Sequence, residues 1–181
     1  GGTGMLGSFL SKHLVNSEII FGRKHVDLTD LQKTKQWLNN KKFSTIIHTA
    51  AFTDLDFCEK NEEMSFVLHS SIIEVFRKHC SKIVYISTVP VWDEKHYKKN
   101  VYFESKKSGE QKVLNCENGL VIRTNIYGDG GLVKWAVNNI SNKQKINGFS
   151  DVYFNPIHVA QLTDFIVQII QKDKCESLYT V

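Results

Sequence analysis

A tyrosine and a lysine four positions apart, Tyr102 and Lys106, are the pair of side chains in this sequence best suited to chemistry. At positions i and i+4 of a helix, both lie on the same face. An ammonium beside a phenol favours the phenolate and lowers its pKa, so the tyrosine can exchange a proton with a carbonyl oxygen. The strand-like run Ile83–Ile86 ends in Ser87-Thr88, and a hydroxyl at a strand end can bind the same oxygen. We therefore predict that Thr88, Tyr102 and Lys106 form a catalytic set.

A glycine-rich loop, Gly1-Gly2-Thr3-Gly4-Met5-Leu6-Gly7, leads directly into an apolar helix. Glycines let a backbone turn tightly and approach a diphosphate, and a helix N-terminus offers free N–H groups and a positive dipole end. The alternative interpretation is a flexible turn. The GxxGxxG spacing in an alternating β/α chain favours a dinucleotide site, for which we predict the cofactor-binding residues Gly1, Gly4, Met5, Leu6 and Gly7.

The second predicted strand, Glu18–Phe21, ends in the basic pair Arg23-Lys24. NAD sites usually place an acid near this position to hold the ribose 2′-hydroxyl, whereas an arginine can accommodate the 2′-phosphate of NADP. We therefore expect NADP(H) as the preferred cofactor, bound by Arg23, with NAD(H) as the alternative. The competing interpretation is that both basic side chains are simply solvated.

Strand-like and helix-like segments alternate along the chain, and the strands are apolar without strict alternation, as in strands covered on both faces. This pattern predicts an α/β fold with a doubly wound parallel sheet, the Rossmann fold. The remaining predicted strands are Thr45–His48, Lys82–Ser87, Leu120–Arg123 and Ser177–Val181. The predicted helices are Leu6–Val15, Leu28–Asn40, Glu62–Cys80, Phe103–Leu114, Leu132–Ile140 and Val159–Ile170.

The domain prediction has three parts. Residues 1–143 form the Rossmann domain, residues 144–158 begin a small, largely missing C-terminal substrate lobe, and residues 159–181 return to the Rossmann domain. A glycine loop of this kind should follow a central strand, so we expect a first strand upstream. Only 13 residues separate Thr88 from Tyr102, and we expect that residues have dropped out there.

Composition excludes several functional classes. The 181 residues carry a net charge of +4, and 41% of them are apolar. The lysines are scattered between acids, without the basic stripe of a nucleic-acid-binding protein. No apolar run is long enough to span a membrane, and no signal peptide opens the chain. The four cysteines lack framework or zinc spacing, so we expect reduced thiols in a cytoplasmic protein and no metal. The three tryptophans are most simply packing residues.

Taken together, these motifs resemble the extended short-chain dehydrogenase/reductases, and within them the dTDP-4-dehydrorhamnose reductase-like branch, over nearly the whole chain. The segments that carry the resemblance are Gly1–Gly7, Asp27–Asp30, His48–Thr53, Ile86–Thr88, Tyr102–Lys106, Ser108–Glu110, Arg123–Gly128 and Phe154–Ile157.

The resemblance implies reduction at C4 of a nucleotide-linked 4-keto-6-deoxy sugar by hydride from NAD(P)H, with Tyr102 protonating the oxygen. It also implies that Thr88 orients that oxygen and Lys106 holds the nicotinamide ribose. Homodimers are common in this family. The remaining residues that it assigns are Asp27 and Leu28 beside the adenine, Ala50 and Ala51 along the cofactor, and Asn125 facing the substrate.

Two departures from the branch leave alternatives open. Val89-Pro90 stands where Asp-Tyr is usual, which argues against a 4,6-dehydratase, and His69 stands where the branch has an asparagine. We expect the histidine to hydrogen-bond but not to copy an amide. The alternatives are a non-catalytic dinucleotide-binding regulatory subunit and a sugar-nucleotide epimerase that holds oxidised cofactor tightly.

Overall fold

The computed structural model describes residues 1–14, 24–89, 99–148, 155–172 and 175–181. Four strands form one parallel sheet in the order β1-β2-β3-β6. In register, Ile46 of β1 lies opposite Ile83 of β2, and Tyr85 of β2 lies opposite Val121 of β3. The predicted parallel α/β fold is confirmed. The strands are β1 (Phe43–His48), β2 (Cys80–Ser87), β3 (Gly119–Arg123) and β6 (Leu178–Thr180).

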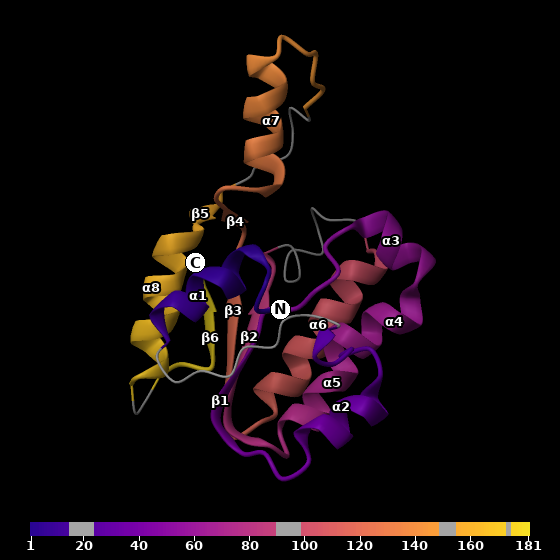
Figure 1. Ribbon diagram of the computed structural model, residues 1–181, viewed down its shortest axis with the longest axis vertical. Coiled ribbons are helices and arrows are strands. Elements are labelled where there is room, and N and C mark those ends of the chain that lie inside the picture. Colours follow the sequence, from indigo (N-terminus) through magenta and orange to yellow (C-terminus); the bar gives the residue numbers. More distant parts are fainter. Residues whose placement is uncertain (15–23, 90–98, 149–154, 173–174) are drawn as a thin grey trace.

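Helices cover both faces of the sheet (Figure 1). On one face, α1 (Met5–His13) and α8 (Val159–Ile170) share an apolar cluster with Val84 and Ile122. The other face carries α2 (Leu31–Leu38), α5 (Ile72–Phe76) and α6 (Val101–Leu114). Burial on both faces explains why the central strands are continuous apolar runs.

The predicted helix over Glu62–Cys80 is wrong as a single element. The structure divides it into α4 (Glu62–Phe66), a π-helical segment η2 (Val67–Ser71) and α5, and Cys80 begins β2. The helix ends early because the carbonyl of His79 accepts the Phe43 N–H of β1, which draws the backbone into the sheet. Single π-helical turns inside helices frequently occur at functional sites.

Two aspartates fix where short helices start. The Asp30 carboxylate accepts the Lys33 N–H, so α2 begins at Leu31 rather than at the predicted Leu28. Asp54 caps α3 (Leu55–Lys60) in the same way.

Helix α7 (Gly131–Ser141) projects away from the body formed by the sheet and its flanking helices (Figure 1). It follows β4 (Ile126–Tyr127), which pairs with β5 (Ile157–His158) in a small second sheet. Trp135 on α7 is 50% exposed, so its expected packing role is wrong, whereas Trp37 packs against the core. Trp92, Arg23 and the predicted strand Glu18–Phe21 lie outside the described residues.

Candidate active site

The glycine loop lies against the end of β1, and its glycines are required by close approach. A Cβ on Gly1 would lie 2.5 Å from the backbone nitrogen of Ala50, and one on Gly7 would overlap the Gly1 carbonyl. Gly4 is the N-cap residue of α1 and makes no side-chain cap hydrogen bond to the first N–H groups of this helix. The first N–H groups of α1 are therefore suited to a diphosphate.

Met5 and Leu6, also predicted to bind the cofactor, lie in the first turn of α1. The Leu6 side chain is buried in the core, so Leu6 could contribute only through its backbone. The Met5 sulfur lies close to Gly128, which follows β4. Met5 thus places the first turn of α1 beside the residue that follows β4.

Three predicted side chains meet where β2 and β3 end. Asn100 caps α6 by accepting the Phe103 N–H, and this places Tyr102 in the first helical turn. The hydroxyls of Tyr102 and Thr88 are hydrogen-bonded, and Thr88 Oγ1 donates to Asn125 Oδ1 at 3.4 Å. Two hydroxyls and an amide therefore converge at the carboxyl edge of the sheet, where ligands bind in open α/β folds.

Lys106 lies one turn further along α6 and is buried at 3% exposure. Its Nζ donates to the Ile86 carbonyl at 2.5 Å and lies 4.2 Å from the centroid of the Tyr85 ring. Burial lowers the pKa of Lys106 to about 7, and the carboxylate of Glu110 opposes this effect. We refer to the predicted catalytic residues Thr88, Tyr102 and Lys106, together with the predicted substrate-binding residue Asn125, as the catalytic group.

The expected lowering of the Tyr102 pKa is wrong. Burial of the phenol raises its pKa to about 12, and the hydrogen bond with Thr88 only partly opposes this. The Lys106 ammonium is bonded to the Ile86 carbonyl and lies over the Tyr85 ring, and it is not among the causes that shift the Tyr102 pKa. Tyr102 is therefore a protonated phenol at neutral pH.

The remaining predicted cofactor residues are more dispersed. Ala50 and Ala51 are half-buried in the segment that follows β1, with the Ala50 nitrogen beside Gly1. Leu28 is buried in the core on the α2 side of the sheet. The Asp27 carboxylate accepts both the N–H and the hydroxyl of Thr29.

Two buried hydroxyls beside the catalytic group have no hydrogen-bond partner among the described residues. They are Ser87 Oγ, directly before Thr88, and Thr124 Oγ1, directly before Asn125. Buried polar atoms are rarely unpaired, so these hydroxyls mark a place where water or a polar ligand fits.

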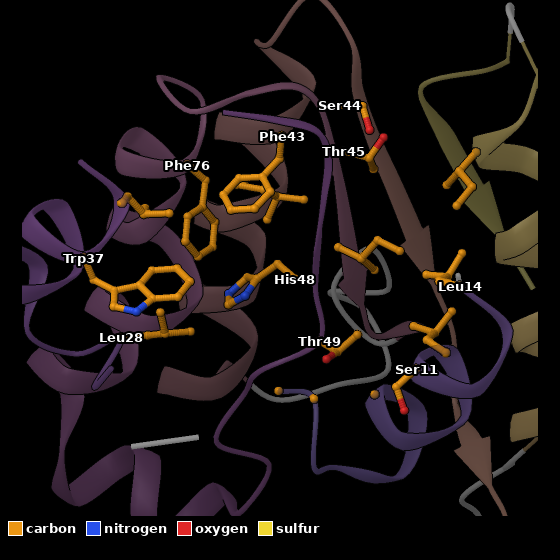
Figure 2. Close-up of a pocket in the computed structure, with 18 of the residues that line it drawn as sticks. Ser11, Leu14, Leu28, Trp37, Phe43, Ser44, Thr45, His48, Thr49 and Phe76 are labelled. Atoms are coloured by element: carbon orange, nitrogen blue, oxygen red, sulfur yellow. The ribbon is translucent and has the colours of Figure 1, made fainter. Parts of the chain in front are cut away.

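A cavity of about 540 Å³ runs along the outer edge of β1 and reaches the glycine loop. Residues 43–49 line it, with Trp37 and Phe76 on one side and Ser11 and Leu14 on the other (Figure 2). Within the described part of the chain, its lining does not include the catalytic group. The cavity is therefore separate from the catalytic group.

Sequence reasoning missed the groups behind the catalytic group. Glu110 is 2% exposed, and its carboxylate binds Arg123 through Nε and Nη2, the shortest contact being 2.6 Å. Its spacing of four from Lys106 was a signal, because such residues share a helix face. Tyr85 is fully buried and donates to the His69 carbonyl, and a tyrosine within an apolar strand usually has such a partner.

The described residues hold no group of three or more side chains able to bind a metal ion. Nor do they contain a helix long and apolar enough to cross a membrane.

The parallel sheet, the glycine loop before α1, the hydroxyl after β2 and the tyrosine and lysine on α6 define an extended short-chain dehydrogenase/reductase. Within this class the chain belongs to the RmlD substrate binding domain family, whose model matches residues 1–181. The predicted resemblance is confirmed.

Named relatives agree with this assignment. The chain is 24% identical to the spore coat polysaccharide biosynthesis protein SpsK of Bacillus subtilis, covering 93% of this chain and 67% of the relative. It is also 24% identical to the dTDP-4-keto-6-deoxy-D-glucose reductase of Streptomyces niveus, covering 94% and 67%. A dTDP-4-dehydrorhamnose reductase of Bacillus anthracis, solved with NADP, is 28% identical with a TM-score of 0.82, covering 100% of this chain and 72% of that one.

Proposed function

We propose that this protein is an NADP(H)-preferring reductase of the C4 carbonyl in a nucleotide-linked 4-keto-6-deoxy sugar. The observation that carries the proposal is the hydrogen-bonded set of Tyr102, Thr88 and Asn125, with Lys106 one turn away on α6. The names of the Streptomyces and Bacillus anthracis reductases support the substrate class, and the NADP in the latter structure supports the cofactor.

The chain offers a fitting place for a dinucleotide. Gly1 and Gly7 are packed so closely against neighbouring backbone that neither position could carry a side chain. The first N–H groups of α1, which follow this loop, suit a diphosphate. Ser87 and Thr124 add two buried hydroxyls without partners among the described residues. When bound, the reduced nicotinamide supplies a hydride to the carbonyl carbon.

The residues of the chain complete the reduction by proton transfer. Thr88 orients the substrate oxygen, and Tyr102 gives its phenolic proton to that oxygen as the C–O double bond becomes a single bond. A pKa of about 12 keeps Tyr102 protonated before the reaction, as a proton donor requires. A proton from solvent then restores the phenol. Lys106, one turn further along α6, would hold the nicotinamide ribose, as the family resemblance implies.

Replacing Tyr102 by phenylalanine tests the proposal. We expect Y102F to lower kcat by about 10²- to 10⁴-fold, the usual contribution of a general acid, with NADPH affinity unchanged. The measurements are NADPH oxidation with a dTDP-4-keto-6-deoxyhexose and direct binding of NADPH. Tyr179→Phe is the matched control, because that hydroxyl accepts the Glu176 N–H at the far edge of the sheet.

Unchanged turnover in Y102F would refute the role of the phenol. If the wild-type protein binds NADPH tightly and reduces no 4-keto sugar nucleotide, a non-catalytic regulatory subunit is the better assignment. Oxidised NAD that co-purifies with the protein, together with epimerised product, would indicate an epimerase.

A further inference from the structure

We propose that His69 is a positioning residue that holds the segment after β1 and the first turn of α6 in register, and so orients Tyr102. The inference rests on the proposed function. His69 lies in η2, and its side chain is fully buried. Its Nε2 accepts the Phe52 N–H at 2.9 Å, and its Nδ1 lies 2.8 Å from Ser105 Oγ.

The direction of each hydrogen bond follows from the Phe52 end. A backbone N–H can only donate, so Nε2 is an acceptor and the proton of the neutral ring is on Nδ1. Nδ1–H then donates to Ser105 Oγ, and the Ser105 hydroxyl donates to the Tyr102 carbonyl at 3.0 Å. One continuous chain of donors runs from the segment beside the glycine loop to the backbone of Tyr102.

The surroundings keep the imidazole neutral. Burial, together with the nearby Lys106 and His48, lowers the pKa of His69 to about 3. A protonated ring would have an N–H at Nε2 and could not accept from Phe52. The bridge therefore persists throughout the neutral pH range.

His69 also supports the lysine of the catalytic group, through its backbone. Its carbonyl accepts the Tyr85 hydroxyl at 2.8 Å, and the Tyr85 ring lies beneath the Lys106 ammonium. Gly109 allows this approach, because a Cβ there would overlap the His69 carbonyl and crowd Tyr85. The His69 and Tyr102 rings pack nearly perpendicular to each other at a centroid distance of 5.8 Å.

The neighbouring residue provides a matched control. Ser70 Oγ and Ser108 Oγ are 2.8 Å apart, so they also join η2 to α6, but no described hydrogen bond takes this link to Tyr102. A purely structural role predicts that loss of either link affects only stability. A positioning role predicts that only loss of the His69 link affects the chemical step.

The kinetic experiment compares three variants. We expect His69→Leu to lower kcat by about 10- to 100-fold through misplacement of Tyr102, with the KM for the sugar nucleotide nearly unchanged. His69→Asn keeps one acceptor and one donor, as the neutral imidazole does, and should recover most of kcat. Ser70→Ala should lower the unfolding midpoint and leave kcat unchanged. Equal kcat in H69L and the wild type would overturn the inference.

A spectroscopic experiment separates this inference from the proposed function. In ¹⁵N NMR at pH 5, His69 should show the neutral Nδ1–H tautomer, and the ring signals of Tyr102, assigned with Y102F, should shift in H69L but not in S70A. These results would support the bridge even if the wild-type protein reduced no sugar nucleotide. Titration of His69 near pH 6.5, or Tyr102 signals unchanged in H69L, would overturn it.

Discussion

At the residue scale, the charges behind the catalytic group are buried and paired. Arg123 at the end of β3 reaches the Glu110 carboxylate on α6, and Glu110 in turn raises the pKa of Lys106 against the effect of burial. A buried ion pair adds little stability over an apolar pair of equal volume, but loss of one partner is costly. The pair therefore serves chiefly to hold a carboxylate near Lys106.

Replacing Arg123 by methionine tests this interpretation. We expect R123M to lower the free energy of unfolding by about 3–5 kcal/mol, because the carboxylate of Glu110 remains buried without its partner. The double variant Glu110→Leu/Arg123→Met should regain most of this loss. Urea denaturation measures both. Equal destabilisation by the single and double variants would contradict the explanation.

At the element scale, α7 and α8 contrast sharply. Both carry an apolar face, but α8 is packed against α1 and the sheet, whereas no side chain of α7 is buried among the described residues. Leu132, Trp135, Val137 and Ile140 are each at least half exposed. Helix α7 therefore contributes little to the packing of the described body.

The same substitution on the two helices measures this difference. Leu162→Ala on α8 removes a fully buried side chain and should cost about 2–5 kcal/mol of unfolding free energy. Leu132→Ala on α7 should change it by no more than about 0.5 kcal/mol. Both values come from denaturant titrations of the purified protein. A large loss in L132A would show that α7 is covered in solution.

At the scale of the whole molecule, two neutral histidines are enclosed on the α5 side of the sheet. His48 donates from Nε2 to the Leu68 carbonyl and packs against Phe76 and Tyr85, and burial lowers its pKa to about 3. His69 has a similarly lowered pKa. Unfolding exposes both rings to water, where each takes up a proton near pH 6.5.

Acid should therefore destabilise the fold before the carboxylates titrate. As the pH falls from 6.5 towards about 3, the unfolded chain binds two more protons than the folded chain. Each histidine then contributes a loss of about 1.4 kcal/mol per pH unit. Unfolding free energies between pH 5 and pH 8 measure the slope, and His69→Asn should halve it below pH 6. A flat profile would show that the rings are not held neutral.

The sequence alone was enough to predict the secondary structure that depends on near neighbours. Helical periodicity located α8 at its observed bounds, and continuous β-branched runs located β1, β2 and β3 to within a few residues. The four-residue spacing placed Tyr102 and Lys106 on one helix, and the strand-end position of Thr88 brought it to the same edge of the sheet. These features follow from short-range geometry.

Only the tertiary structure decided how those residues interact. The Tyr102 pKa rises because burial outweighs the hydrogen bond with Thr88, and Lys106 bonds to Ile86 instead of to the phenol. The π-helical turn at His69 and its bond to Ser105, 36 residues away, have no local signal. Desolvation and hydrogen-bond partners depend on atoms that are remote in sequence, so spacing could bring the candidate side chains together but could not set their protonation or alignment.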